Sequence, residues 1–303
     1  MKIISYRDFK NKDQLFPLMH QALWWPLDYR ELEQVIKVDE RLSGPVGFCA
    51  VEEDQLAGFV GVLDITSKTT LGIQKVGGIW GVATSPSFAN RGIFKKLMNR
   101  THEYFKGQGY PLCFLFTSRT LIAYEMYGKL GYEEVEGLKG TPSAYKLCSG
   151  GGFDNEESEN TLDWEKIYDT YNRSVEGKTG FVIRQDNYKE ALEAWKRIEV
   201  NKSIQKDSGY ALLLEREGAV RIREIIAEDE KAYENLISEI EQRAEGALLD
   251  VMVVDEKLEK AYRSHDFLIQ RDNYDVLMVK KLAESSFGDL YGDKFQVRAL
   301  DTF

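Results

Sequence analysis

Residues 82–98 read Val-Ala-Thr-Ser-Pro-Ser-Phe-Ala-Asn-Arg-Gly-Ile-Phe-Lys-Lys-Leu-Met. In this stretch a strand ends, a short turn follows and a helix begins. The strand is expected over 77–83, because the proline that follows it at position 86 cannot continue a central strand. The helix is expected over 91–106, where apolar residues recur at helical spacing. Gly92, at the helix start, leaves room for a ligand to approach the backbone.

A helix start of this kind can bind an anion. The N–H groups of the first turn have no acceptor within the helix, and the helix dipole is positive at that end. A pyrophosphate suits such a turn. Arg91 and Gly92 also fit an ordinary connection between a strand and a helix, so these two residues alone leave both interpretations open.

Strands and helices surround this turn. Two short runs that favour strands, 48–51 and 58–63, are separated by a polar segment and predict a hairpin. The continuous apolar run 111–116 is typical of a strand covered on both faces. A second helix is expected over 120–130, and Gly131 suits its C-terminal cap. The first half therefore consists of helices packed on a sheet.

Two motifs carry a resemblance to a known family. The pattern Val82-x-x-x-Pro86-x-x-x-x-Arg91-Gly92-Ile93-x-x-x-Leu97 resembles the acetyl-CoA motif of the GCN5-related N-acetyltransferases (GNAT). The second helix adds Ala123-x-x-x-Tyr127-Gly128-Lys129-Leu130-Gly131-Tyr132, which is similar to that family's Ala-x-x-x-Tyr-x-x-x-Gly-Phe signature. The two motifs occur in the family's order, and the resemblance covers about the first 147 residues.

The second half resembles the second domain of the enhanced intracellular survival (Eis) family of tandem acetyltransferases. The resemblance rests on segments 167–171, 177–184, 188–195, 210–214 and 220–225. It implies an α+β fold with tandem GNAT-like domains, each a mixed, mostly antiparallel sheet flanked by helices. The second domain is expected to lack the CoA loop, and no room is left for the sterol-carrier-like third domain of that family.

The expected division of the chain follows from this resemblance and from composition. The glycines and acidic residues of 149–160 predict a flexible linker. An acetyl-CoA-binding GNAT domain is expected over 1–148, a degenerate GNAT-like domain over 161–283, and a C-terminal tail over 284–303.

The resemblance also assigns the cofactor-binding residues. Strand backbone groups are expected to bind the pantetheine arm, and the loop and helix start are expected to bind the pyrophosphate. The residues concerned are Val82, Ala83 and Thr84 for the arm, and Ala89, Asn90, Arg91, Gly92, Ile93 and Phe94 for the pyrophosphate. Ala89 and Phe94 depart from the wider family's pattern, and the missing side chain at 89 puts one phosphate contact in doubt.

Tyr127 is the candidate general acid, because a phenol can protonate the CoA thiolate as it leaves. A core tyrosine at helix spacing is the structural alternative, and Tyr124 is the second candidate for the acid. In the resembling family the C-terminal carboxylate acts as the base. Phe303 is therefore the candidate base here.

Aromatic and acidic residues suit a cationic amine, so Trp24, Trp25, Asp28 and Glu125 are candidates for the acceptor pocket. The two tryptophans also fit a plain packing role between early helices. His102 is expected on the solvated face of its helix.

The composition narrows the class of partner. The chain of 303 residues has 50 acidic and 40 basic residues and a net charge of −10, which argues against nucleic acid and an anionic membrane as partners. No apolar run reaches the ~18 residues of a membrane span, and no signal-peptide pattern occurs, so a cytoplasmic location is expected. The three histidines and three cysteines lack metal-ligand spacing, so no metal is expected.

These features predict an enzyme that moves acetyl from acetyl-CoA to a primary amine of a small cationic acceptor by direct attack. The resemblance suggests an aminoglycoside- or polyamine-like acceptor. Two alternatives stay open: a non-catalytic CoA-binding sensor or interaction scaffold, and a protein amine as acceptor. A homo-oligomer is compatible with each of these interpretations.

Overall fold

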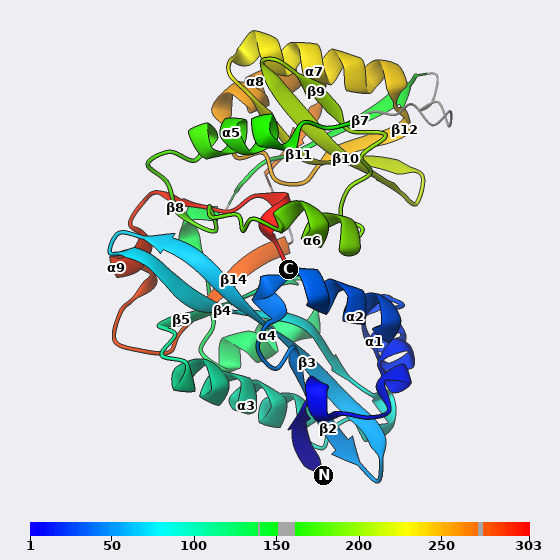
Figure 1. Cartoon of the computed structure of the whole chain (residues 1–303), viewed down its shortest axis with the longest axis vertical. Coiled ribbons are helices and arrows are strands. Elements are labelled where there is room, and N and C mark those ends of the chain that lie inside the picture. The colour runs from blue at the N-terminus through cyan, green and yellow to red at the C-terminus, as the bar shows by residue number, and fades with distance from the viewer. Residues whose placement is uncertain (139, 151–160, 272–274) are drawn as a thin grey trace.

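The structure is a computed structural model that describes residues 1–138, 140–150, 161–271 and 275–303. Two sheets lie one above the other in Figure 1, and the C-terminus lies between them. Most of the expected linker, residues 151–160, falls outside the described part of the chain.

The first sheet has the order β1–β2–β3–β4–β5–β14–β6, and its neighbours are antiparallel except for β4 and β5. The short strands β8 and β15 pair with each other, and β8 also pairs with β3. The strands of this sheet are β1 (Lys2–Ser5), β2 (Gly47–Glu52), β3 (Gln55–Thr69), β4 (Gly72–Thr84), β5 (Leu112–Ser118), β6 (Glu133–Glu134), β8 (Thr179–Gly180), β14 (Asp275–Lys281) and β15 (Phe295–Gln296).

Helices cover both faces of this sheet. Apolar residues of α3 and α4 pack on one face, and those of α1 and α2 pack on the other. The helices are α1 (Leu15–Leu23), α2 (Tyr29–Val38), α3 (Ile93–Gly107) and α4 (Ile122–Lys129), with 3-10 turns η1 (Tyr6–Asp8), η2 (Lys12–Gln14), η3 (Glu40–Leu42), η4 (Pro86–Phe88) and η5 (Glu136–Leu138).

The second sheet has the order β13–β7–β12–β11–β10–β9, in which only β11 and β12 run parallel. Helices α7 and α8 pack on one face, and α5 and α6 pack on the other. The elements are β7 (Ser143–Ser149), α5 (Trp164–Ser174), α6 (Tyr188–Ala194), β9 (Ile204–Lys206), β10 (Gly209–Arg216), β11 (Ala219–Ala227), α7 (Glu230–Arg243), β12 (Glu245–Asp250), α8 (Glu256–Ser264) and β13 (Leu268–Gln270). Two mixed, mostly antiparallel sheets confirm the predicted α+β class.

The sheets do not divide at the expected boundary between 1–148 and 161–283. Strand β7, from the first range, pairs with β12 and β13 of the second sheet. Strand β14, from the second range, enters the first sheet between β5 and β6. Each half thus gives one strand to the other. A local pattern shows that a strand exists but carries no information on its distant partner, which is why the sequence placed both strands with their chain neighbours.

Residues 284–303, expected to form a tail, instead pack into the first sheet's core. They form α9 (Phe287–Tyr291), strand β15 and the 3-10 turn η6 (Ala299–Asp301). Leu290 and Tyr291 are almost fully buried in that core, and Leu300 is almost fully buried in the core under α5 and α6 of the second sheet. Phe114 of β5 contacts four aromatic rings that hold this segment in place: Phe181, Phe287, Tyr291 and Phe295.

Candidate functional site

Strands β4 and β5 separate midway along their length. They pair over Gly77–Ile79 and Cys113–Leu115 only. Beyond that point, β4 continues to Thr84 beside β3, and β5 continues to Ser118 beside β14. The facing edges of the two strands have no strand partner among the described residues, so their backbone groups are available to a ligand that enters the gap.

A bulge begins the separation. Gly81 has a φ of +58°, and the pairing of β4 with β3 shifts register beside it, between Phe59 and Gly61. A β-bulge bends its strand and re-aims the backbone. A side chain at 81 would need the left-handed backbone and would meet Met19 at 2.9 Å. The predicted arm-binding residues 82–84 follow this bulge directly.

The helix start predicted to bind a pyrophosphate opens toward solvent. Helix α3 begins after Gly92, whose φ is +69°, and no side chain caps it. Asn90 also takes a left-handed backbone, with a φ of +62°. Ala89, Asn90, Arg91 and Gly92 are exposed. Since no side chain caps the first turn, its N–H groups remain available for an anion.

Arg91 lies at this helix start and is held loosely. Its guanidinium stacks 5.1 Å from the centre of the Phe88 ring and makes an exposed ion pair with Glu52 at 3.3 Å. An exposed pair of this kind is worth little, so the guanidinium can turn to a phosphate at small cost.

Tyr127 is buried behind the turn, with 5% of its surface exposed. Its ring lies 5.6 Å from that of Phe94, in the first turn of α3, and 5.8 Å from that of Tyr132. Burial raises the pKa of the Tyr127 phenol, so it stays protonated at neutral pH. Tyr124, the second candidate, donates to Glu134 at 2.7 Å and is therefore already engaged.

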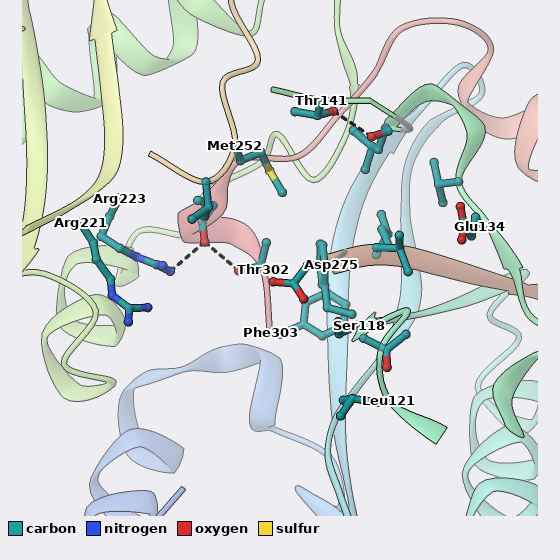
Figure 2. A pocket seen from close by; sticks show the side chains of 18 of the residues that line it. Ser118, Leu121, Glu134, Thr141, Arg221, Arg223, Met252, Asp275, Thr302 and Phe303 are labelled. Carbon is teal, nitrogen blue, oxygen red and sulfur yellow. Dashed lines mark hydrogen bonds between the residues drawn. The ribbon is translucent and has the colours of Figure 1, made fainter. Parts of the chain in front are cut away.

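A cavity of about 480 Å³ lies between the two sheets (Figure 2). Residues 116–118 of β5 line it, and they also form one side of the gap between β4 and β5. Phe303 lines it too, and its ring packs on Phe116 at 5.6 Å. The charged side chains of the lining are those of Glu134, Arg221, Arg223 and Asp275.

The four predicted acceptor residues do not come together at this cavity. Trp24 is 85% exposed, and Glu125 is exposed on α4. Asp28 caps α2 and pairs with Arg30. Trp25 packs between Trp80 and Trp195, at ring distances of 5.9 and 6.3 Å. None of the four lines the cavity, and Trp25 has the packing role given above as its alternative.

Sequence reasoning missed Arg221, Arg223 and Asp275. The two arginines alternate with Val220 and Ile222, and this alternation in a predicted strand was a signal that both face one side. Asp275 gave no local signal, because it reaches the site through the exchanged strand β14.

Within the described residues, no helix is long and apolar enough to cross a membrane. In the same part of the chain, histidine, cysteine and acidic side chains form no group of three or more that could hold a metal ion.

Residues 30–135 match the family described as acetyltransferase (GNAT) domain. None of the curated proteins matches the chain. Among solved structures, the chain is similar to a GCN5-related N-acetyltransferase from Kribbella flavida, with 14% identity and a TM-score of 0.63 over 93% of this chain and 72% of that one. A GCN5-related N-acetyltransferase from Anabaena variabilis has 14% identity and a TM-score of 0.62, over 93% of this chain and 73% of that one. Eis1 from Mycobacterium abscessus has 15% identity and a TM-score of 0.59, over 93% of this chain and 74% of that one. At these identities the likeness establishes the fold, and it extends over both halves.

Proposed function

Since residues 30–135 match the acetyltransferase (GNAT) domain family, we propose that the chain transfers acetyl from acetyl-CoA to a primary amine of a small acceptor. The GNAT family implies an acyl-CoA co-substrate. The observation that carries the proposal is the gap between β4 and β5: on one side of it β5 lines the cavity between the sheets, and on the other side β4 leads through residues 85–92 to the open start of α3.

The residues around the gap fit the parts of an acyl-CoA. The uncapped first turn of α3 and Arg91 suit the pyrophosphate. The free edge of Val82, Ala83 and Thr84 suits the amide groups of the pantetheine arm, since amides need backbone partners. Acyl-CoA supplies a thioester carbon that an amine can attack.

The chain's own residues account for the proton transfers. A backbone N–H of β4 in the gap would hold the carbonyl oxygen as it gains negative charge. The C–N bond forms first and gives a tetrahedral intermediate, and the C–S bond then breaks as Tyr127 gives its phenolic proton to the leaving sulfur. The ammonium proton of the acceptor must pass to a base that lines the cavity. Phe303 and Asp275 are the two candidates in the lining.

The acceptor is proposed as a small molecule because residues of both sheets line the cavity. The resemblance favours an aminoglycoside- or polyamine-like amine, and Asp275 gives the cavity one group that suits an ammonium. A CoA sensor is the alternative function, and it would have no use for a proton donor at Tyr127.

Calorimetric titration with acetyl-CoA, on the wild type and on Gly92→Trp, tests the proposal. A β-carbon at 92 meets no atom within 4 Å, so the indole would project into the space in front of the helix. We expect one-site binding by the wild type, weakened at least tenfold in the variant.

Gly177→Trp is the matched control. Gly177 is also exposed, has a φ of +71° and has open space at its β-carbon, so the substitution brings the same backbone strain at a distance from the site. Equal weakening by both variants, or no binding by the wild type, would refute the assignment of the loop.

A further inference from the structure

Two arginines point into the same end of the cavity. Arg221 and Arg223 lie two residues apart on β11, so their side chains leave the same face of the sheet. Ile222 between them and Val220 before them face the core under α7 and α8. Figure 2 shows the two guanidinium groups side by side at one end of the cavity, with Glu134 at the other end and Asp275 between.

Neither guanidinium has a close acidic partner in the cavity. Arg223 donates to the backbone oxygen of Ala299 at 2.9 Å and makes no ion pair with any described residue. Arg221 approaches Glu217 at 3.6 Å, outside the cavity, where that carboxylate is 72% exposed. The Nε atoms of both arginines are buried without a hydrogen-bond partner. Burying a donor without an acceptor costs free energy, so these two Nε–H groups favour a ligand that can accept from them, such as an anion.

A third cation adds to the positive charge. Arg197 donates to the backbone oxygen of Thr302 at 2.8 Å. Burial lowers its pKa to about 10, and the charges of Arg223 and Arg41 add to the shift. The nearby carboxylate of Asp250 accepts from the Tyr262 hydroxyl and the Met252 N–H rather than from an arginine.

The part of the cavity beyond the arginines has the opposite charge. Asp275 pairs in register with Ser118, where β5 ends beside the gap. An ammonium at Asp275 would therefore lie at the gap side of the cavity, and a group bound by the arginines would lie away from it. Charges of both signs suit a ligand that has both an amine and an acid.

We propose that the acceptor carries a carboxylate in addition to its amine, as an amino acid or short peptide does, and that Arg221 and Arg223 bind this carboxylate. A guanidinium binds a carboxylate through two parallel N–H donors. This inference rests on the proposed function, and it replaces a purely cationic acceptor with a zwitterionic one.

The test compares acceptors that differ only in the acid. Release of CoA thiol is measured with lysine and lysinamide, with phenylalanine and phenylalaninamide, and with spermidine as a cation without an acid. We expect kcat/KM to be at least about tenfold higher for each carboxylate form than for its amide, as for a charge-assisted contact. Arg223→Gln and Arg221→Gln should remove this advantage, mainly through KM, and leave acetyl-CoA affinity unchanged.

Arg216→Gln, on the neighbouring strand β10 and outside the cavity, is the matched control and should keep the advantage. The Arg221 side chain is 37% exposed, so Arg221→Gln should disturb folding less. This variant provides the test if Arg223→Gln fails to fold. Equal turnover of acid and amide, turnover of spermidine alone, or an advantage that survives in both arginine variants would overturn the inference.

Binding of the same pairs to the CoA-saturated protein, followed by calorimetry, separates the two proposals. Preferential binding of the acids that the arginine variants lose, without acetyl transfer, would refute the proposed function and support the anion site. If no acid binds and none is acetylated, the anion site is refuted.

Discussion

Tyr127 combines two properties that a general acid in this position needs. It is buried beside the first turn of α3, and burial keeps its phenol protonated. The sequence predicted this residue from its spacing to Gly131, and its role as the acid stays a prediction. The same burial is what a core tyrosine would show, so only kinetics separates the two.

Tyr127→Phe should lower kcat about 10²- to 10⁴-fold, the usual range for a lost general acid, and leave the Kd for acetyl-CoA unchanged. Thiol release and calorimetry measure the two quantities. Tyr124→Phe is the control on the same helix, because it removes a hydroxyl that is already bonded to Glu134. A loss of rate in the Tyr124 variant alone would move the acid to that residue. Full activity in both variants would remove tyrosine acid catalysis.

His102 shows where residue-level prediction fails. Its expected place on the solvated face is wrong, since it is 7% exposed and its Nε2 is 2.8 Å from the Tyr132 hydroxyl. A polar side chain can be buried when a distant group satisfies it. Burial lowers its pKa to about 4. Helical spacing located the apolar positions of α3 but could not show that partner.

At the scale of elements, the sequence located the strands and helices around the turn, but the bounds of these elements in the structure differ from the expected ones. Strand β3 was expected over 58–63 and spans Gln55–Thr69. The extension contains buried polar residues that end an apolar pattern. Ser67, for example, donates to the oxygen of Gly180 and contacts the hydroxyl of Tyr291. Both partners are more than 100 residues away in the sequence, so hydropathy alone could not extend the strand.

The two residues after η6, Thr302 and Phe303, can be deleted to test whether Phe303 is the catalytic base. Deleting Thr302 and Phe303 should reduce kcat at least tenfold if Phe303 takes the proton, with acetyl-CoA affinity retained. Asp275→Asn is the paired variant, because Asp275 lies in the same lining. A rate loss only in Asp275→Asn assigns the base to β14. Retained turnover in the deletion variant excludes Phe303.

At the scale of the whole molecule, the exchanged strands tie the two sheets together. Strand β14 fills the place between β5 and β6 and brings Leu277 and Met278 into the first sheet's two cores. A fragment that ends before β7 lacks this strand and leaves an unpaired edge and exposed apolar surface.

We expect residues 1–142 alone to show no cooperative thermal transition. The same fragment joined through a flexible linker to residues 275–281 should regain part of it. Circular dichroism during heating measures the transition, and a scrambled version of the added strand is the control. Cooperative melting of residues 1–142 alone would show that β14 is dispensable for the first domain.

Strand exchange also sets an order of events during synthesis. The loop, helix and strands that would bind acetyl-CoA are all made within the first 118 residues, but the neighbour of β5 ends at Lys281. A growing chain therefore emerges from the ribosome with this site unsupported on one side until β14 has been made. Co-substrate capture should thus begin only after residue 281 has been added, and nascent chains would depend on chaperones until then.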